Sequence, residues 1–326
     1  MKKFYLAPCL FANIIGAAHI AETQALSSIT SQAEIRCFSA PASAVEREAQ
    51  AAFQYYLDEV ELDASLTNEE QHGKVQEFKR FAEGLFPEAA SLLSTLLLQE
   101  TRSRIIDILH NAELETKEIQ AYLDDYEEVI LGVQNMTVEI ARQMLFFVAE
   151  LKSHRQYVYE FGIALGCPEK QLLRHDLCKL RVEQFEGYAR YFRGGKQEDD
   201  KLAYLTAWEV HQNEEHHHES YRKDGFSFDD VSEERLRNNM LEAVADLLAA
   251  TKQRGGSTLI DWLVKVFPTK NPHPLILPFL EEALIKSHAF YLDSEKNQDS
   301  DSIFKGFPCW NSDVEEVFLK LKGHII

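Results

Sequence analysis

The stretch VEIARQMLFFVAELKSHRQYVYEFGIALG, from Val138 to Gly166, decides the fold class of this chain. Apolar residues recur in it at spacings of three and four, which is the period of an amphipathic helix. The helix should end at Gly166, because a glycine followed closely by a proline is a usual helix exit. His154 lies in this stretch, and the apolar Val158 and Phe161 follow it by four and seven residues. We therefore expect a long helix with a histidine on its buried face.

The same periodicity continues on both sides of this stretch. Nine prolines and fourteen glycines are few for 326 residues, which also favours helices over strands. The chain is therefore predicted to be all-α. The other expected helices span residues 44–63, 75–86, 87–110, 114–128, 169–179, 182–192, 199–211, 232–252 and 257–267, with one more ending near residue 290. Residues 293–301 are polar and are expected to form a loop.

Composition and charge limit the classes of molecule that this protein is expected to bind. Hydrophobic residues make up 45% of the chain and charged residues 27%, as in an ordinary soluble globular protein. The formal net charge of −19 argues against general binding to nucleic acid, because the phosphates would be repelled. It does not exclude a small anionic substrate, since a metal ion changes the local field. No apolar stretch is long and clean enough to cross a bilayer, so no membrane partner is expected.

Cysteine usage and the N-terminus bear on the compartment. The five cysteines are odd in number and form no CxxC pair, so a disulfide framework is not expected and the cytoplasm is the better assignment. Lys2 and Lys3 precede a mostly apolar run over residues 4–21, which loosely resembles a signal peptide. A proline and polar residues interrupt this run and no clean cleavage site follows, which favours a buried first helix or strand.

Side chains that bind metals gather in one part of the chain. Six of the twelve histidines fall between His154 and His218. His175 and Asp176 place a nitrogen ligand beside an anionic oxygen ligand, which suits a divalent metal. The later ligand-type residues are His211, His216, His217, His218, Glu242 and Asp246. Each group alone has an ordinary explanation, such as a chance pair, a solvated loop or acids that face water. Their order along the expected helices favours a metal site.

This order resembles the HD-domain superfamily of metal-dependent phosphohydrolases, whose core is a helical bundle. His154 matches the first histidine of the family, His175-Asp176 the pair that names it, and Asp246 the last aspartate. Lys179 holds the lysine place of the HDxxK pattern. The resemblance implies one or two divalent metal ions (Mn, Fe, Ni, Co or Zn) held by His154, His175, Asp176, His211, His217, His218 and Asp246, with the choice among His216, His217 and His218 open.

A branch of HD-like proteins from phages and bacteria, with no assigned function, is similar in the runs HDLCKLRVEQFEGYARYF and AWEVHQNEEHHHESY. This resemblance covers roughly residues 152–252. Cys178 departs from it, because a glycine or serine is more usual there. We therefore expect an HD-domain-like bundle over residues 131–326, with a C-terminal helical extension. Residues 1–130 are expected to be an additional helical region of unknown role.

Polar residues next to the His-Asp pair are candidates for catalysis beside Asp176. Arg174 and Lys179 flank the pair and could hold a phosphate, although surface solvation explains them equally well. Aromatic and basic residues over 188–193 could line a pocket or pack in the core. Glu183 and Glu186 could orient ligand histidines, but plain surface charge is the favoured explanation.

Three functions remain open on the sequence. The first is hydrolysis of a phosphoester, such as a nucleotide or another small phosphate, with the metal as Lewis acid. The second is a di-iron oxygenase that cleaves a C–C or C–P bond, as some two-metal members of the superfamily do. The third is a non-enzymatic binding module. The order of the ligand-type residues along the chain argues against this third function. The reaction class rests on the resemblance, and metal identity separates the first two.

Overall fold

The computed structural model describes residues 43–60, 68–133, 135–193, 198–221, 231–254 and 259–323, and this part of the chain is all-α, as predicted. The signal-peptide-like run, Cys9 and Cys37 lie outside the described residues. The α-helices are α2 (Ala44–Tyr55), α3 (Asn68–Glu83), α4 (Pro87–Asn111), α5 (Thr116–Gly132), α6 (Val138–Leu165), α7 (Glu169–Leu172), α8 (Val182–Arg193), α9 (Glu198–Glu214), α10 (Glu233–Arg254), α11 (Leu259–Lys265), α12 (Leu277–Asn297) and α13 (Ser312–Gly323). Short π or 3-10 segments are η2 (Tyr56–Val60), η3 (Leu177–Leu180), η4 (His216–Tyr221), η5 (Phe267–Lys270) and η6 (Pro274–Ile276). Among the described helices, none is both long and apolar enough to span a membrane.

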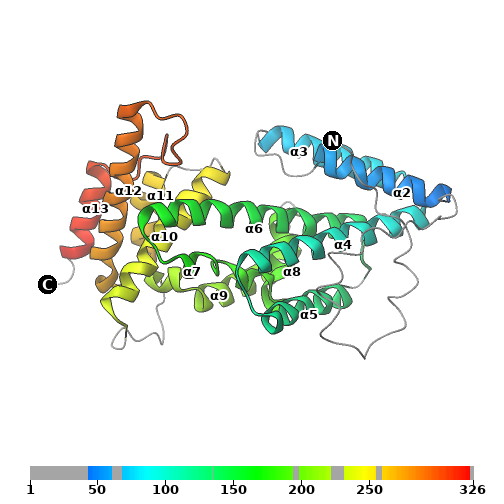
Figure 1. Ribbon diagram of the computed structural model, residues 1–326, viewed down its shortest axis with the longest axis horizontal. Coiled ribbons are helices and arrows are strands. Elements are labelled where there is room, and N and C mark those ends of the chain that lie inside the picture. Colours follow the sequence, from blue (N-terminus) through cyan, green and yellow to red (C-terminus); the bar gives the residue numbers. More distant parts are fainter. Residues whose placement is uncertain are drawn as a thin grey trace.

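The long central helix is α6, with α4 packed along it on one side and α10 on another (Figure 1). The Thr137 side chain caps its start by accepting the Ile140 backbone N–H at 3.2 Å. It ends at Gly166, whose φ of 81° lies in the left-handed region that glycine adopts without a steric penalty. Both helix ends thus follow from the local sequence.

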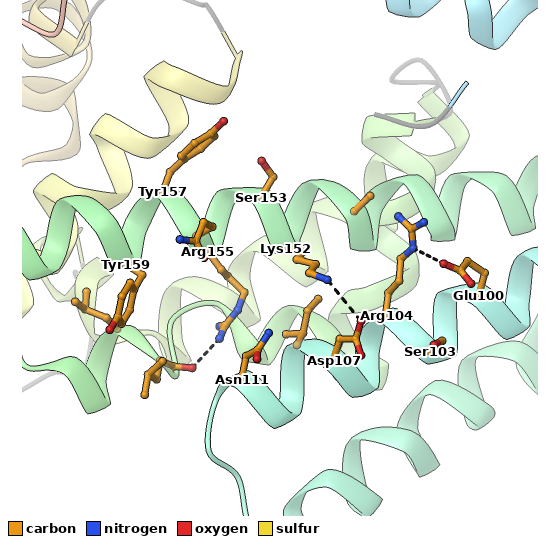
Figure 2. A pocket seen from close by; sticks show the side chains of 15 residues that line it. Glu100, Ser103, Arg104, Asp107, Asn111, Lys152, Ser153, Arg155, Tyr157 and Tyr159 are labelled. Atoms are coloured by element: carbon orange, nitrogen blue, oxygen red, sulfur yellow. Dashed lines mark hydrogen bonds and ion pairs between the residues drawn. The ribbon is translucent and has the colours of Figure 1, made fainter. Parts of the chain in front are cut away.

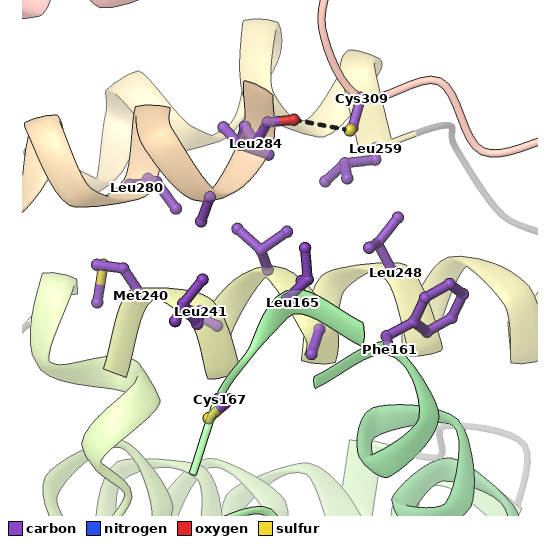
Figure 3. Packing of buried hydrophobic residues seen from close by; sticks show 14 of the residues in the cluster. Phe161, Leu165, Cys167, Met240, Leu241, Leu248, Leu259, Leu280, Leu284 and Cys309 are labelled. Atoms are coloured by element: carbon purple, nitrogen blue, oxygen red, sulfur yellow. Dashed lines mark hydrogen bonds between the residues drawn. The ribbon is translucent and has the colours of Figure 1, made fainter. Parts of the chain in front are cut away.

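Three groups of buried apolar residues are arranged along α6. The N-terminal cluster joins α2, α3 and α4 to the first turns of α6 around Leu145. The middle cluster joins α4, α5, α8 and α9 to the middle of α6 around Phe147. The C-terminal cluster joins the end of α6, around Phe161, to α10, α11 and α12 (Figure 3). Helix α13 adds Val314 and Phe318 to it. Helices before and after residue 130 therefore share the N-terminal and middle clusters.

The expected helix over residues 169–179 is wrong. Helix α7 ends at Leu172, η3 starts at Leu177, and the His-Asp pair lies in the turn between them. Asp176 has a φ of 60°, a left-handed conformation that aspartate tolerates better than most residues but that no α-helix contains.

Two further differences concern the C-terminal part and α9. Helix α12 continues to Asn297, so the expected loop over 293–301 begins later, and α13 was not expected. Helix α9 runs to Glu214, so His211 lies within its last turn instead of ending it.

Candidate metal centre

Histidines and carboxylates from five parts of the fold meet at one place. His154 comes from α6, the His175-Asp176 pair from the turn after α7, and Asp246 from α10. His211 comes from the last turn of α9, and His217 and His218 come from η4. The histidines of this set and Asp176 are buried. The structure therefore brings together all seven residues that the sequence suggested as metal ligands.

A first group surrounds one oxygen of Asp176. His154 Nε2 lies 3.5 Å from Asp176 Oδ2 and 2.9 Å from Asp246 Oδ1. His175 Nε2 lies 3.5 Å from Asp176 Oδ2 and 3.8 Å from Asp246 Oδ1. Ligand atoms about 2 Å from one ion are separated by about 3 to 4 Å, so two histidines and two carboxylates here can share a divalent cation.

A second group surrounds the other oxygen of Asp176. His211 Nε2 lies 3.4 Å from Asp176 Oδ1 and 3.0 Å from His218 Nε2. His217 belongs to the same buried histidine group. Because the two oxygens of Asp176 face different histidines, this carboxylate can bridge two cations. Cys178 and Glu215 form a neighbouring group with His211, and Glu215 Oε2 also lies 3.7 Å from His217 Nδ1.

Unsatisfied buried atoms support a cation at this place. His175 Nε2, Asp176 Oδ1 and His217 Nε2 are buried and have no hydrogen-bond partner within the part of the chain that the structure describes. Such atoms are costly unless something satisfies them. A divalent cation fits this donor set, because imidazole nitrogens and carboxylate oxygens are its usual ligands.

Glu242 contacts the ring nitrogen of His175 that faces away from Asp176. Its Oε1 lies 2.8 Å from His175 Nδ1, and its Oε2 accepts the Gln171 side-chain amide at 2.6 Å. A carboxylate on Nδ1 keeps the proton there and leaves Nε2 free as a ligand. The sequence showed that Glu242 shares a helix face with Asp246, but not that this face is buried against a histidine.

Arg155 fixes the backbone of the His-Asp turn. Its guanidinium donates to the carbonyl of His175 and, at 2.6 Å, to that of Leu173. It also lines a separate groove of about 800 Å³ between α4 and α6, where Lys152 pairs with Asp107 (Figure 2). Sequence reasoning missed this residue, because nothing in the pattern links position 155 to carbonyls about twenty residues later.

The electrostatics of the centre reflect burial among opposite charges. Burial raises the pKa of Asp176, but the histidines and Lys179 around it outweigh burial and hold that pKa well below its usual range. Burial lowers the pKa of His154, and it lowers that of His211 well below the usual value. Burial alone would lower the pKa of His217, yet Glu242, Asp246 and Glu215 raise it to about 9.

A cavity of about 390 Å³ opens onto this centre. It is lined by cluster members such as His154 and Asp246 and by Lys179. Two tryptophans, Trp208 and Trp262, and a further cation, Lys270, line its wall. Trp262 and Lys270 were not expected, because they come from the C-terminal part of the chain.

The candidate catalytic residues differ in where they lie. Lys179 is in the cavity wall, and its ammonium donates to Asp176 Oδ2 at 2.6 Å. Arg174 is exposed and contacts Glu118 at 3.4 Å, so the structure does not bring it to the centre. Of the histidine triplet, His217 and His218 are buried in the centre, whereas His216 is exposed and contacts Arg235.

A protein-family model matches part of this chain. No curated protein and no solved structure matches this chain. The matched family is described as a family of unknown function (DUF5662), and its model aligns with the segment that carries every residue of the centre. Residues 143–286 of this chain are similar to that family.

Proposed function

We propose that this protein is a metal-dependent hydrolase of the HD-domain type that acts on a phosphoester. The observation that carries the proposal is Asp176, whose two oxygens face two separate groups of buried histidines beside an open cavity. A bound divalent metal would supply Lewis acidity to a phosphoryl oxygen and lower the pKa of a water ligand.

The protein's own residues would divide the remaining work. Glu242 holds the proton on His175 Nδ1 and so keeps Nε2 available. The Lys179 ammonium, in the cavity wall, offsets negative charge on the transferring group.

The rest of the cavity wall suggests the shape of the substrate. Trp208 and Trp262 offer flat apolar surface, and Lys270 offers a second cation. A phosphoester with a flat ring, such as a nucleotide, suits this combination, and so does a smaller phosphate with an apolar group.

The test combines metal analysis with hydrolysis assays on nucleotides and simple phosphomonoesters. Asp176→Asn keeps the size of the side chain and its tolerance of the left-handed conformation but removes the anion. We expect it to lose metal and activity while its circular dichroism stays that of the wild type. His216→Gln, on the same short helix but exposed, is the matched control and should keep both. Full activity with metal still bound in Asp176→Asn would refute the proposal.

A di-iron oxygenase is the second candidate, because one shared carboxylate among histidines also suits a pair of irons. Elemental analysis and an optical spectrum under air separate the two. Two irons per chain would favour the oxygenase, whereas manganese, nickel, cobalt or zinc would favour the hydrolase.

A further inference from the structure

The two sides of the candidate centre differ in what supports their histidines. On the first side, Nδ1 of His175 meets the carboxylate of Glu242 at 2.8 Å. On the second side, Nδ1 of His211 meets a thiol, with Cys178 Sγ at 3.1 Å. A carboxylate makes an imidazole ligand more basic, whereas a neutral thiol has little such effect.

The hydrogen bonds around Cys178 determine which partner donates the proton in its contact with His211. Gln184 donates its amide N–H to Glu214 at 2.8 Å, so its Oε1 is the atom that faces Cys178, at 3.5 Å. Gln184 Oε1 and the Glu215 carboxylate are both acceptors for the S–H proton, which leaves a sulfur lone pair for the N–H of His211. His211 then carries its proton on Nδ1 and donates it to the sulfur. Its Nε2, which faces Asp176 and His218, is free to act as a ligand.

We propose that Cys178 is a positioning residue for the second metal position, and that its thiol makes this position the weaker of the two. This inference rests on the proposed metal-dependent function. Cys178 selects the tautomer and ring orientation of His211 without ligating the ion itself. The first position, supported by Glu242, fills at lower metal concentration, and the second fills after it.

Cys178 lines a cavity other than the one that holds the metal ligands. A surface pocket of about 560 Å³ is lined by Cys178 together with Tyr122 and Arg181. Among the described residues, this pocket and the cavity over the centre share no lining residue. Cys178 therefore contacts His211 but is not among the described residues that line the cavity over the centre, as expected of a positioning residue.

The experiment is a titration of the metal-free protein with Co²⁺, read by calorimetry and by the visible absorption of the bound ion. The wild type should bind two ions with unequal affinity. Cys178→Ala should weaken the second ion by about 10- to 100-fold and leave the first unchanged. Cys178→Ser should restore most of the second affinity, because a hydroxyl can both accept from His211 and donate to Gln184. Cys167→Ala, in the C-terminal cluster, is the matched control and should match the wild type.

Three outcomes would count against the proposal. If Cys178→Ala binds both ions like the wild type, the positioning role is refuted while the metal centre stands. If the wild type shows a sulfur-to-cobalt charge-transfer band that Cys178→Ser lacks, Cys178 is a ligand instead. If the wild type binds no Co²⁺, the proposed metal-dependent function itself fails.

Discussion

Replacing Glu242 by glutamine should weaken the first metal position strongly while leaving the fold in place. Both oxygens of Glu242 accept hydrogen bonds, from His175 Nδ1 at 2.8 Å and from the Gln171 amide at 2.6 Å. A glutamine offers one oxygen and one NH₂ group, so it can accept from only one of these two donors. The other donor then faces an NH₂ group in a buried place, since Glu242 is 2% exposed.

The size of the effect follows from the two ways in which this conflict can be relieved. One way leaves a buried donor unsatisfied, which costs about 1–3 kcal/mol. The other moves the His175 proton to Nε2, which is the atom that faces Asp176 and Asp246. Either way, metal affinity should fall by about 10- to 100-fold, as for other residues that orient a ligand histidine. This corresponds to about 1.4–2.7 kcal/mol.

The assay is metal titration of Glu242→Gln beside Glu234→Gln, which alters an exposed glutamate on the same helix. The control should bind metal like the wild type, and circular dichroism should show that both variants keep their helices. Wild-type affinity at the first position in Glu242→Gln would refute the reasoning, because the carboxylate would then not be what sets the tautomer of His175.

The other predictions concern pH, the His-Asp turn and helix packing. In metal-free protein the pKa of His217 is raised to about 9, so its charged form stabilises the fold below pH 6.5 and that contribution is lost as the pH rises toward 9. The free energy of unfolding should fall by at most about 3 kcal/mol over this range, and His217→Gln should flatten the dependence in denaturant melts. Asp176→Ala should be less stable than Asp176→Asn by about 1 kcal/mol in thermal melts of metal-free protein, because alanine tolerates a φ of 60° less well; equal stability would contradict this account. Gly187→Ala should destabilise the chain by about 1–3 kcal/mol, because its new Cβ would lie 2.6 Å from the backbone oxygen of Ala203 where α8 packs on α9. Gly73→Ala, whose new Cβ would have no atom of another described residue within 4 Å, should instead stabilise the chain by up to about 1 kcal/mol. Similar melting temperatures for the two variants would refute the packing argument.

Much of the helical pattern and the members of the centre could be predicted from the sequence, because both depend on local signals. The period of α6 and the glycine at its end are local, and so is the spacing of ligand-type residues. The turn at Asp176 was missed because its conformation depends on Arg155, a residue on a different helix that bonds the turn's carbonyls.

The supporting residues were harder to predict for a related reason. Arg174 stands next to His175 in the sequence, yet its side chain is exposed beside Glu118. Glu242 was a plausible surface residue by spacing alone, and only the packing of α10 against the His-Asp turn shows its partner. Trp262 and Lys270 reach the cavity through the fold of the C-terminal helices, which no local pattern encodes.

Because α6 passes through all three apolar clusters, it should determine how the protein unfolds. Leu145, Phe147 and Phe161 belong to different clusters but to one continuous helix, so no cluster can come apart without disturbing the backbone of α6. The backbone amides in the centre of α6 should therefore exchange with solvent deuterium only when all three clusters unfold together. The ends of peripheral helices should exchange by local fraying. His154 lies on α6 between the middle and C-terminal clusters. Ligation there would slow exchange along the helix at both ends and not only beside the metal.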